Sequence, residues 1–118
     1  YPLPKENVGE NLEIVKKEIP ADIILEDDKM MIFKDIRPKA PVHLLLVPKR
    51  HIGPISELEL KDGNTISYLI FKAKEAAEKA GVSEKGYRLV FNVGKNAGME
   101  VDHLHLHLLG GKSLCLLK

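Results

Sequence analysis

Between residues 102 and 111 the chain reads D-H-L-H-L-H-L-L-G-G, and this stretch constrains the fold more than any other. Alternation of polar and apolar residues with a period of two is typical of a half-buried β-strand. The pattern therefore predicts a strand whose leucines face a core, while His103, His105 and His107 share the opposite face. Residues on one face of a strand lie about 6.6 to 6.8 Å apart, so the outer two imidazoles would be separated by about 13 Å.

Such a row of imidazoles could bind a phosphate group, bind a metal ion, or serve only the structure of the strand. The rings are spaced too widely for all three to reach one ion at the usual nitrogen–metal distance of about 2 Å. The one cysteine, Cys115, offers no Cys-x-x-Cys partner, so acidic residues or further histidines would have to complete a metal site. A neutral imidazole can attack phosphorus or accept a proton, and a protonated one donates to phosphate oxygens. We therefore favour a nucleotide-phosphate site and predict neither a metal nor another cofactor.

The length and composition of the chain narrow the classes of protein to which it could belong. Its 118 residues suffice for one domain with its own core. The 18 basic and 17 acidic residues leave a net charge of +1, which excludes a general attraction to nucleic acid or to an anionic membrane. The single cysteine fits a reducing compartment, and the sequence shows neither a membrane-spanning apolar run nor a signal-peptide pattern, so we expect a cytoplasmic protein. Residues 1–8 are expected to be a disordered or tag-like N-terminus before a single domain over residues 9–118.

Periodicity and turn residues predict an α+β domain with an antiparallel sheet. A short helix is expected over residues 10–17, before Pro20, and a long helix over residues 60–80, capped by Gly81. Strands are expected over residues 23–25, 30–33, 43–47 and 87–93 and over the histidine stretch. Two aromatic residues of the long helix lie off its buried stripe, where they form either the edge of a wide core or a self-association surface: Tyr68 and Phe71.

The sequence of residues 103–109 fits the pattern His-φ-His-φ-His-φ-φ, in which φ is apolar, and resembles the signature of the histidine triad superfamily of nucleotide hydrolases and transferases. Further stretches resemble the Hint branch of that superfamily, the histidine triad nucleotide-binding proteins: Glu-Ile-Pro-Ala at 18–21, Glu-Asp-Asp at 26–28, residues 33–43, Val-Pro-Lys-Arg-His at 47–51 and the Gly110-Gly111 pair. The likeness runs from about residue 11 to residue 112. It implies the histidine triad (HIT) fold, a five-stranded antiparallel sheet with one long and one short helix. It also implies a homodimer in which the two sheets join.

The resemblance gives each histidine of the motif a role. His105 would be the nucleophile that attacks the α-phosphorus of a nucleotide, leaving a nucleotidyl-histidine that water then cleaves. For this, its other ring nitrogen must be held as a donor, by a backbone carbonyl, and the ring must lie open beside the nucleotide. His107 would stabilise charge on the phosphate oxygens, His103 would orient its neighbours, and His43 would stand near the triad. We interpret His51 as an exposed loop histidine.

The resemblance also implies a nucleotide-binding set. Asp35 would accept hydrogen bonds from the ribose hydroxyls, although an aspartate before a proline-rich loop is, by itself, more often a turn former. Ile36 would cover the base or the sugar with apolar surface. Asn92 would reach the phosphate or the leaving group, and Gly98 would let the backbone approach the phosphate closely.

Just before the triad the chain departs from the pattern of its relatives, most of which carry Gly-Gln followed by a hydroxyl residue or a glutamate. Here the sequence is Gly98-Met99-Glu100. Met99 cannot donate the hydrogen bonds of a glutamine, whereas Glu100 could protonate an amine leaving group if its pKa were raised. The residues that follow Gly110-Gly111, at 112–118, also differ from the tryptophan-bearing tail of some relatives, so we do not expect selection of substrates by such a tail.

These features predict a purine nucleoside phosphoramidase, which hydrolyses AMP joined to an amine and whose ligand is an AMP-like purine nucleotide. A dinucleoside polyphosphate hydrolase is the alternative from a sister branch. Met99 motivates a third hypothesis, a nucleotide-binding scaffold with vestigial activity, and the histidine row leaves open a fourth, a metal-dependent hydrolase.

Overall fold

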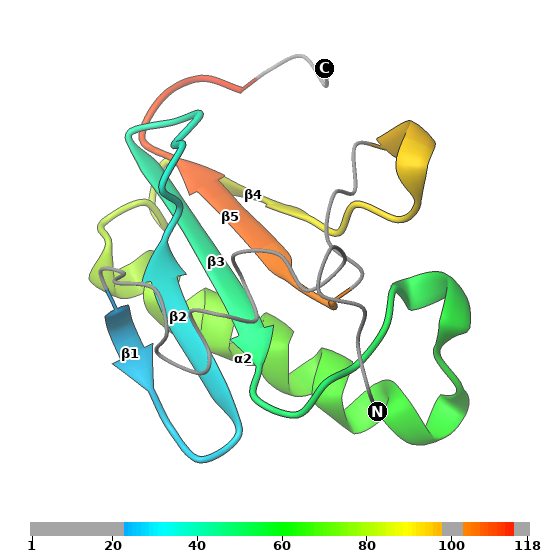
Figure 1. The fold of residues 1–118 in the computed structure, drawn as a ribbon. Coiled ribbons are helices and arrows are strands. Elements are labelled where there is room, and N and C mark those ends of the chain that lie inside the picture. The colour runs from blue at the N-terminus through cyan, green and yellow to red at the C-terminus, as the bar shows by residue number, and fades with distance from the viewer. Residues whose placement is uncertain (1–22, 98–102, 115–118) are drawn as a thin grey trace.

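The computed structural model describes residues 23–97 and 103–114 of the chain. Five antiparallel strands form one sheet in the order β1-β2-β3-β5-β4, with β1 and β4 at its edges (Figure 1). Their bounds are Ile23–Glu26 for β1, Met30–Lys34 for β2, Val42–Pro48 for β3, Tyr87–Val90 for β4 and Leu106–Gly110 for β5. The predicted α+β class and five-stranded sheet are therefore confirmed.

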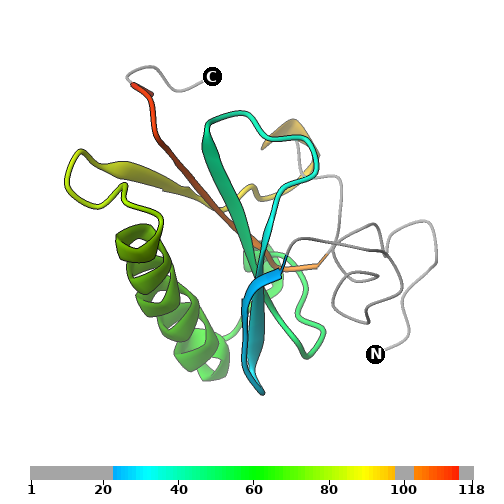
Figure 2. The same cartoon turned by 90° about the vertical axis from the view of Figure 1, so that its left-hand side faces the viewer.

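The long helix α2, Gly63–Lys79, packs along one face of the sheet (Figure 2). It begins three residues later than predicted, because residues 60–62 form a separate 3₁₀ turn, η2, Leu60–Asp62. Two further 3₁₀ turns are η1, Ile55–Glu57, and η3, Lys95–Ala97. Gly81 ends α2 as predicted: its φ of 77° is left-handed, and the amide of Val82 bonds back to the carbonyl of Ala77 at 3.0 Å.

Residues of the central strands are buried on both faces of the sheet. The larger cluster packs against Leu69, Ala73, Ala76 and Ala77 of α2 and includes, from β2, β3 and β5, Met30, Ile32, Leu44, Leu46, Leu106 and Leu108. A second cluster, made of Met31, Phe33, Leu45 and Val47, consists of the alternate residues of β2 and β3. Because successive side chains of a strand point to opposite faces, the continuous apolar run of β3 fits a strand in the middle of a sheet.

Two predicted strands are shorter in the structure. The strand expected over residues 87–93 ends at Val90. The histidine strand begins only at Leu106, so His103 and His105 precede it and His107 alone of the three lies within it. The pairing of Leu46 with Leu106 would bring Pro48 opposite Leu104 if it continued, and proline has no N–H to donate to the ladder.

The short helix over residues 10–17 and the N-terminus at residues 1–8 were predicted for a part of the chain that lies outside the described residues. Within the described parts, no helix is long and apolar enough to cross a membrane.

Candidate active site

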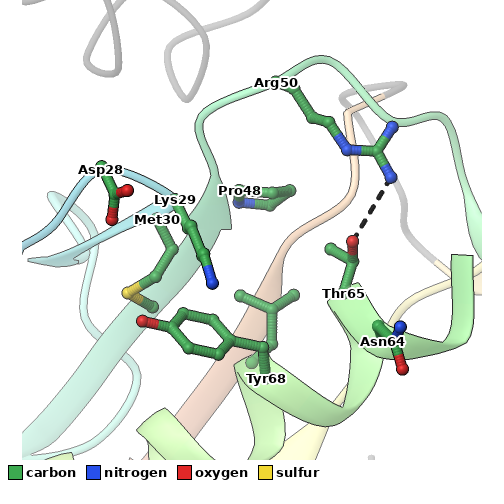
Figure 3. Close-up of a pocket in the computed structure, with 9 residues that line it drawn as sticks. Asp28, Lys29, Met30, Pro48, Arg50, Asn64, Thr65 and Tyr68 are labelled. Carbon is green, nitrogen blue, oxygen red and sulfur yellow. Dashed lines mark hydrogen bonds between the residues drawn. The ribbon is translucent and has the colours of Figure 1, made fainter.

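Two hollows in the described structure differ in what lines them. One, of about 550 Å³, lies between the ends of β2 and β3 and the first turns of α2, and no histidine lines it (Figure 3). There the guanidinium of Arg50 reaches Thr65 Oγ1 at 3.3 Å. The other, of about 410 Å³, lies between the loop that joins β2 to β3 and the last turn of α2, and its lining includes Asp35, His43, Leu44, Ala76 and Ala80. Of the two, only the second has a histidine in its lining, and that histidine is His43.

The five histidines form two pairs with His105 between them, rather than one open row. His51 pairs with His103, and His43 pairs with His107; in each pair the ring centroids lie 5.2 Å apart. The ring of His105 meets that of His107 edge-on, with centroids 5.0 Å apart. The structure thus brings together all the histidines that the sequence singled out.

The prediction that the three histidines share an open face was wrong. The exposed fraction is 0% for His103 and 8% for His105, and only His107 is half-buried. The reason is that the segment before Leu106 leaves the sheet and lies on the loop that follows β3, where the amide of Leu104 bonds to the carbonyl of Ile52 at 2.7 Å. His105 therefore does not lie open in the single chain.

The ring of His105 is held in one tautomer by the backbone. Its Nδ1 lies 2.7 Å from the carbonyl oxygen of His103, which can only accept, so Nδ1–H donates and Nε2 keeps its lone pair. The predicted carbonyl partner is therefore present. Burial lowers the pKa of His105, against the opposing effects of that hydrogen bond and of Asp35. The ring is neutral at neutral pH, as a nucleophile requires.

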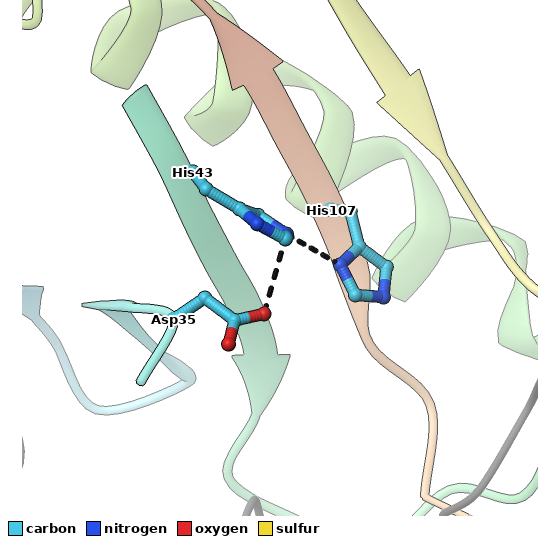
Figure 4. Close-up of side chains that lie close together, drawn as sticks. All are labelled: Asp35, His43 and His107. Carbon is cyan, nitrogen blue, oxygen red and sulfur yellow. Dashed lines mark hydrogen bonds and ion pairs between the residues drawn. The ribbon is translucent and has the colours of Figure 1, made fainter. Parts of the chain in front are cut away.

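The tautomers of His43 and His107 follow from one backbone amide. The N–H of Lys39 donates to Nδ1 of His43 at 3.0 Å, so in the neutral ring Nε2 carries the proton. This Nε2–H lies 3.0 Å from Nδ1 of His107 and 3.2 Å from Oδ2 of Asp35, both of which accept (Figure 4). His107 must then carry its own proton on Nε2, where it can donate to a ligand.

Burial keeps both rings of this second pair neutral. It lowers the pKa of His43, although the carboxylate of Asp35 opposes the effect. It lowers the pKa of His107 to about 4, and the neighbouring His105 and His43 add to the lowering. The donor on Nε2 of His107 therefore belongs to a neutral imidazole rather than to an imidazolium at neutral pH.

The first pair is fixed in the same way. Nε2 of His103 lies 3.2 Å from the carbonyl oxygen of Pro48, so it donates there and Nδ1 is left as an acceptor. Nδ1 of His51 lies 3.1 Å from it and donates. Burial, with a contribution from His51, lowers the pKa of His103 to about 4. Our interpretation of His51 as an exposed loop histidine was wrong, because the residue is half-buried and contacts the triad; its place three residues after the end of β3 gave no sign of this.

Asp35, His43 and His107 could be considered as metal ligands, because one potential ligand atom from each lies within 4.8 Å of the others. Binding through Nε2 of His43 requires a lone pair on that atom. The amide of Lys39 instead places the proton there, since both nitrogens cannot be acceptors in a neutral ring. The hydrogen bonds around the cluster thus favour a chain of protons over a metal centre.

Of the predicted nucleotide-binding residues, the structure describes three. Oδ1 of Asp35 accepts the amide of Arg37 at 2.8 Å, so Asp35 does form a turn, while its Oδ2 faces His43. The side chain of Ile36 is 50% exposed, which is unusual for isoleucine and suits contact with a ligand. Asn92 is half-buried just beyond β4. The remaining three predicted residues of the site lie outside the described residues: Gly98, Met99 and Glu100.

Comparison with known proteins agrees with this geometry. The HIT domain family matches residues 16–114. The chain is 39% identical over 102 residues to the purine nucleoside phosphoramidase of Escherichia coli (strain K12), a match that covers 86% of each chain.

Two solved structures extend the likeness to the fold. A HIT family hydrolase from Legionella pneumophila Philadelphia 1 is 46% identical with a TM-score of 0.85, and the match covers 88% of this chain and 93% of that one. A histidine triad protein from Clostridium difficile is 32% identical with a TM-score of 0.89, and the match covers 98% of this chain and all of that one (100%). The chain therefore belongs to the HIT domain family.

Proposed function

We propose that this protein is a purine nucleoside phosphoramidase that hydrolyses AMP joined to an amine through a covalent intermediate on His105. One observation carries the proposal: the Nδ1–H of His105 is held by the carbonyl of His103 at 2.7 Å, which leaves a lone pair on Nε2 of a neutral ring. The activity named for the Escherichia coli relative supports the choice of substrate.

The reaction takes two displacements. Nε2 of His105 attacks the α-phosphorus, the phosphorus–nitrogen bond breaks, and the amine leaves with a proton from a general acid. Water then attacks the nucleotidyl-histidine and releases AMP and the neutral ring. Attack requires access at one ring nitrogen only, so an exposed fraction of 8% for the side chain as a whole is compatible with it.

We assign the neighbouring histidines to orientation and charge. Nε2–H of His107 would donate to a phosphate oxygen as negative charge develops there, since His43 already occupies its Nδ1. Because this donor is neutral and its ring is fixed by a hydrogen bond, it need not reorganise during the reaction. Glu100, which the sequence places next to the triad, remains our candidate for the acid that protonates the amine.

The nucleotide itself would bind beside the loop after β2. Asp35 would hold the ribose hydroxyls, and the exposed Ile36 would cover the base or the sugar. Asn92 would contact the phosphate or the leaving group, with Gly98 and Met99 close to the phosphate.

The test is turnover of a fluorogenic AMP-amine by the wild type and by His105→Ala, with AMP affinity measured for both. We expect the variant to bind AMP and to lose turnover by several orders of magnitude. Equal rates for the two proteins would refute the role of His105. Wild-type turnover at background with intact AMP binding would instead indicate a nucleotide-binding scaffold, and faster cleavage of a diadenosine polyphosphate would indicate the sister activity.

We further propose that the enzyme is a homodimer in the cytoplasm. Strand β4 lies at an edge of the sheet, where an edge strand can pair with another copy of itself. Helix α2 exposes Phe71 at 66% and Ile70 at 42%, which are large fractions for apolar side chains. Light scattering should give twice the mass of one chain for the wild type, and Phe71→Glu should lower it. A monomeric wild type would refute the dimer. The proposal of a cytoplasmic location rests only on the single cysteine, which fits a reducing compartment.

A further inference from the structure

Residues 103–105 come directly before β5, yet the sheet does not hold them. Three hydrogen bonds tie them instead to the last residue of β3 and to the loop that follows it. The amide of Leu104 donates to the carbonyl of Ile52 at 2.7 Å, Nε2 of His103 donates to the carbonyl of Pro48 at 3.2 Å, and Nδ1 of His51 donates to Nδ1 of His103 at 3.1 Å. Two of these three bonds end on the His103 side chain.

His103 also supplies the group that fixes the proposed nucleophile. Its carbonyl accepts Nδ1–H of His105 at 2.7 Å. The orientation of that carbonyl depends on the conformation of residue 103, whose buried ring is held at both nitrogens. A continuous path of hydrogen bonds thus runs from His51 through His103 to His105.

The direction of each bond along this path has one solution. The Pro48 carbonyl can only accept, which places the proton of His103 on Nε2 and leaves Nδ1 with a lone pair. His51 must therefore donate from Nδ1. Removal of this donor would leave a fully buried acceptor without its partner, and a buried polar group without a hydrogen bond is costly enough to drive the ring to a new position or tautomer.

We propose that His51 is a positioning residue for catalysis, which orients His103 by donating from Nδ1 and thereby aligns the His105 ring for attack on phosphorus. This inference rests on the proposed role of His105 as the nucleophile. It does not place His51 against the substrate. Its effect should therefore fall on the chemical step more than on substrate binding.

Two substitutions of His51 distinguish a role as hydrogen-bond donor from a role in packing alone. Nδ2 of asparagine lies the same number of bonds from Cα as Nδ1 of histidine, so His51→Asn keeps a donor near the same place. His51→Leu keeps a similar volume and has no donor. Ser56→Ala, at an exposed residue of the turn η1 in the same connection, is the control for changes to this segment as such.

The experiment measures kcat and KM on the AMP-amine reporter together with the imidazole ¹⁵N chemical shifts of His103 and His105, which identify the tautomers. For His51→Leu we expect kcat to fall by up to about 100-fold with little change in KM, because a displacement of the order of 1 Å at a reacting group can cost that much. Its His103 or His105 shifts should leave the wild-type values. His51→Asn should recover most of kcat and the wild-type shifts, and Ser56→Ala should match the wild type.

Two results would overturn the proposal: an unchanged kcat in His51→Leu, or an equal loss in the Asn and Leu variants while both tautomers stay as in the wild type. If His51→Leu does not fold, the test depends on His51→Asn. In that variant, wild-type chemical shifts and kcat would support the donor role, and altered shifts with a large loss of kcat would contradict it. The shifts also separate the two proposals. If the wild type shows no turnover but substitution of His51 changes the tautomers of His103 or His105, the positioning role of His51 is supported and the proposed reaction is refuted.

Discussion

Acidification should destabilise the fold well before its carboxylates are protonated, because buried neutral histidines resist protonation. The pKa of His103 is about 4 in the native state, against 6.5 for an ordinary histidine, and its exposed fraction is 0%. Between these two values the unfolded chain binds a proton at this residue and the native chain does not. The free energy of unfolding therefore decreases as the pH falls from 6.5 toward 4.

The size of the effect follows from the two pKa values. One unit of pKa corresponds to about 1.4 kcal/mol, so His103 alone should remove about 2 kcal/mol of stability between pH 7 and pH 5, and about 3 kcal/mol by pH 4. His107, with a native pKa of about 4, acts in the same direction. Asp27 and Asp62 have pKa values below the ordinary 3.8, so their loss of stabilisation begins only at lower pH. The histidine contribution can thus be measured by itself above pH 4.

The assay is urea unfolding at pH 7, 6 and 5 and at one protein concentration, because a dimer would make stability depend on concentration. His103→Gln is the matched variant: it can keep a donor toward the Pro48 carbonyl and cannot titrate. We expect the stability of the variant to fall by about 2 kcal/mol less than that of the wild type between pH 7 and pH 5. If the two proteins lose the same amount, His103 is not held neutral by burial, and the derivation of its tautomer fails with it.

Three further predictions concern the reaction and the core. As the pH is lowered, kcat/KM should remain constant through pH 6.5 and should decrease only at a pH below that value, because burial lowers the pKa of His105. A midpoint at pH 6.5 would contradict this. Turnover should be unchanged in excess chelator, because the amide of Lys39 places a proton on Nε2 of His43 where a metal would need a lone pair; activity that is lost and then restored by a divalent ion would refute it. Leu69→Ala, at a side chain with an exposed fraction of 0% between α2 and the sheet, should lower the free energy of unfolding by about 2 to 5 kcal/mol in urea, and a loss below about 1 kcal/mol would mean that the site closes over the cavity.

The strands could be predicted from the sequence wherever burial repeats along the chain. The apolar run of residues 43–47 became the central strand β3, and the hairpin of β1 and β2 lies where its turn residues predicted it. The long helix was also predicted in the right place, except that residues 60–62 form a 3₁₀ turn. Its buried face was predicted less well, because Ile70, which lies at the spacing of the buried stripe, is 42% exposed. Local periodicity suffices in these segments because each residue's environment repeats with the geometry of the element.

The histidine stretch is where this reasoning failed, because a period of two describes only a strand that has a partner to pair with. Alternation is real from Leu106 onward, where β3 provides that partner. Two residues earlier, at Leu104, the pairing would need an amide from Pro48, which has none, and the chain turns onto the next loop instead. That outcome depends on a residue 55 positions away in the sequence from His103, so no window around the motif could have revealed it.

Three backbone groups give the physical reason to prefer phosphoryl transfer over metal binding for this cluster of five histidines. The amide of Lys39 and the carbonyls of Pro48 and His103 each bond to one ring nitrogen, and each can act only as a donor or only as an acceptor. Every ring then has a defined tautomer, and burial lowers the pKa of His43, His103, His105 and His107. A metal would need lone pairs turned inward at several rings at once, whereas phosphoryl transfer needs one lone pair and nearby fixed donors. The main chain around the motif thus selects the chemistry, and the repeated histidines alone would permit either.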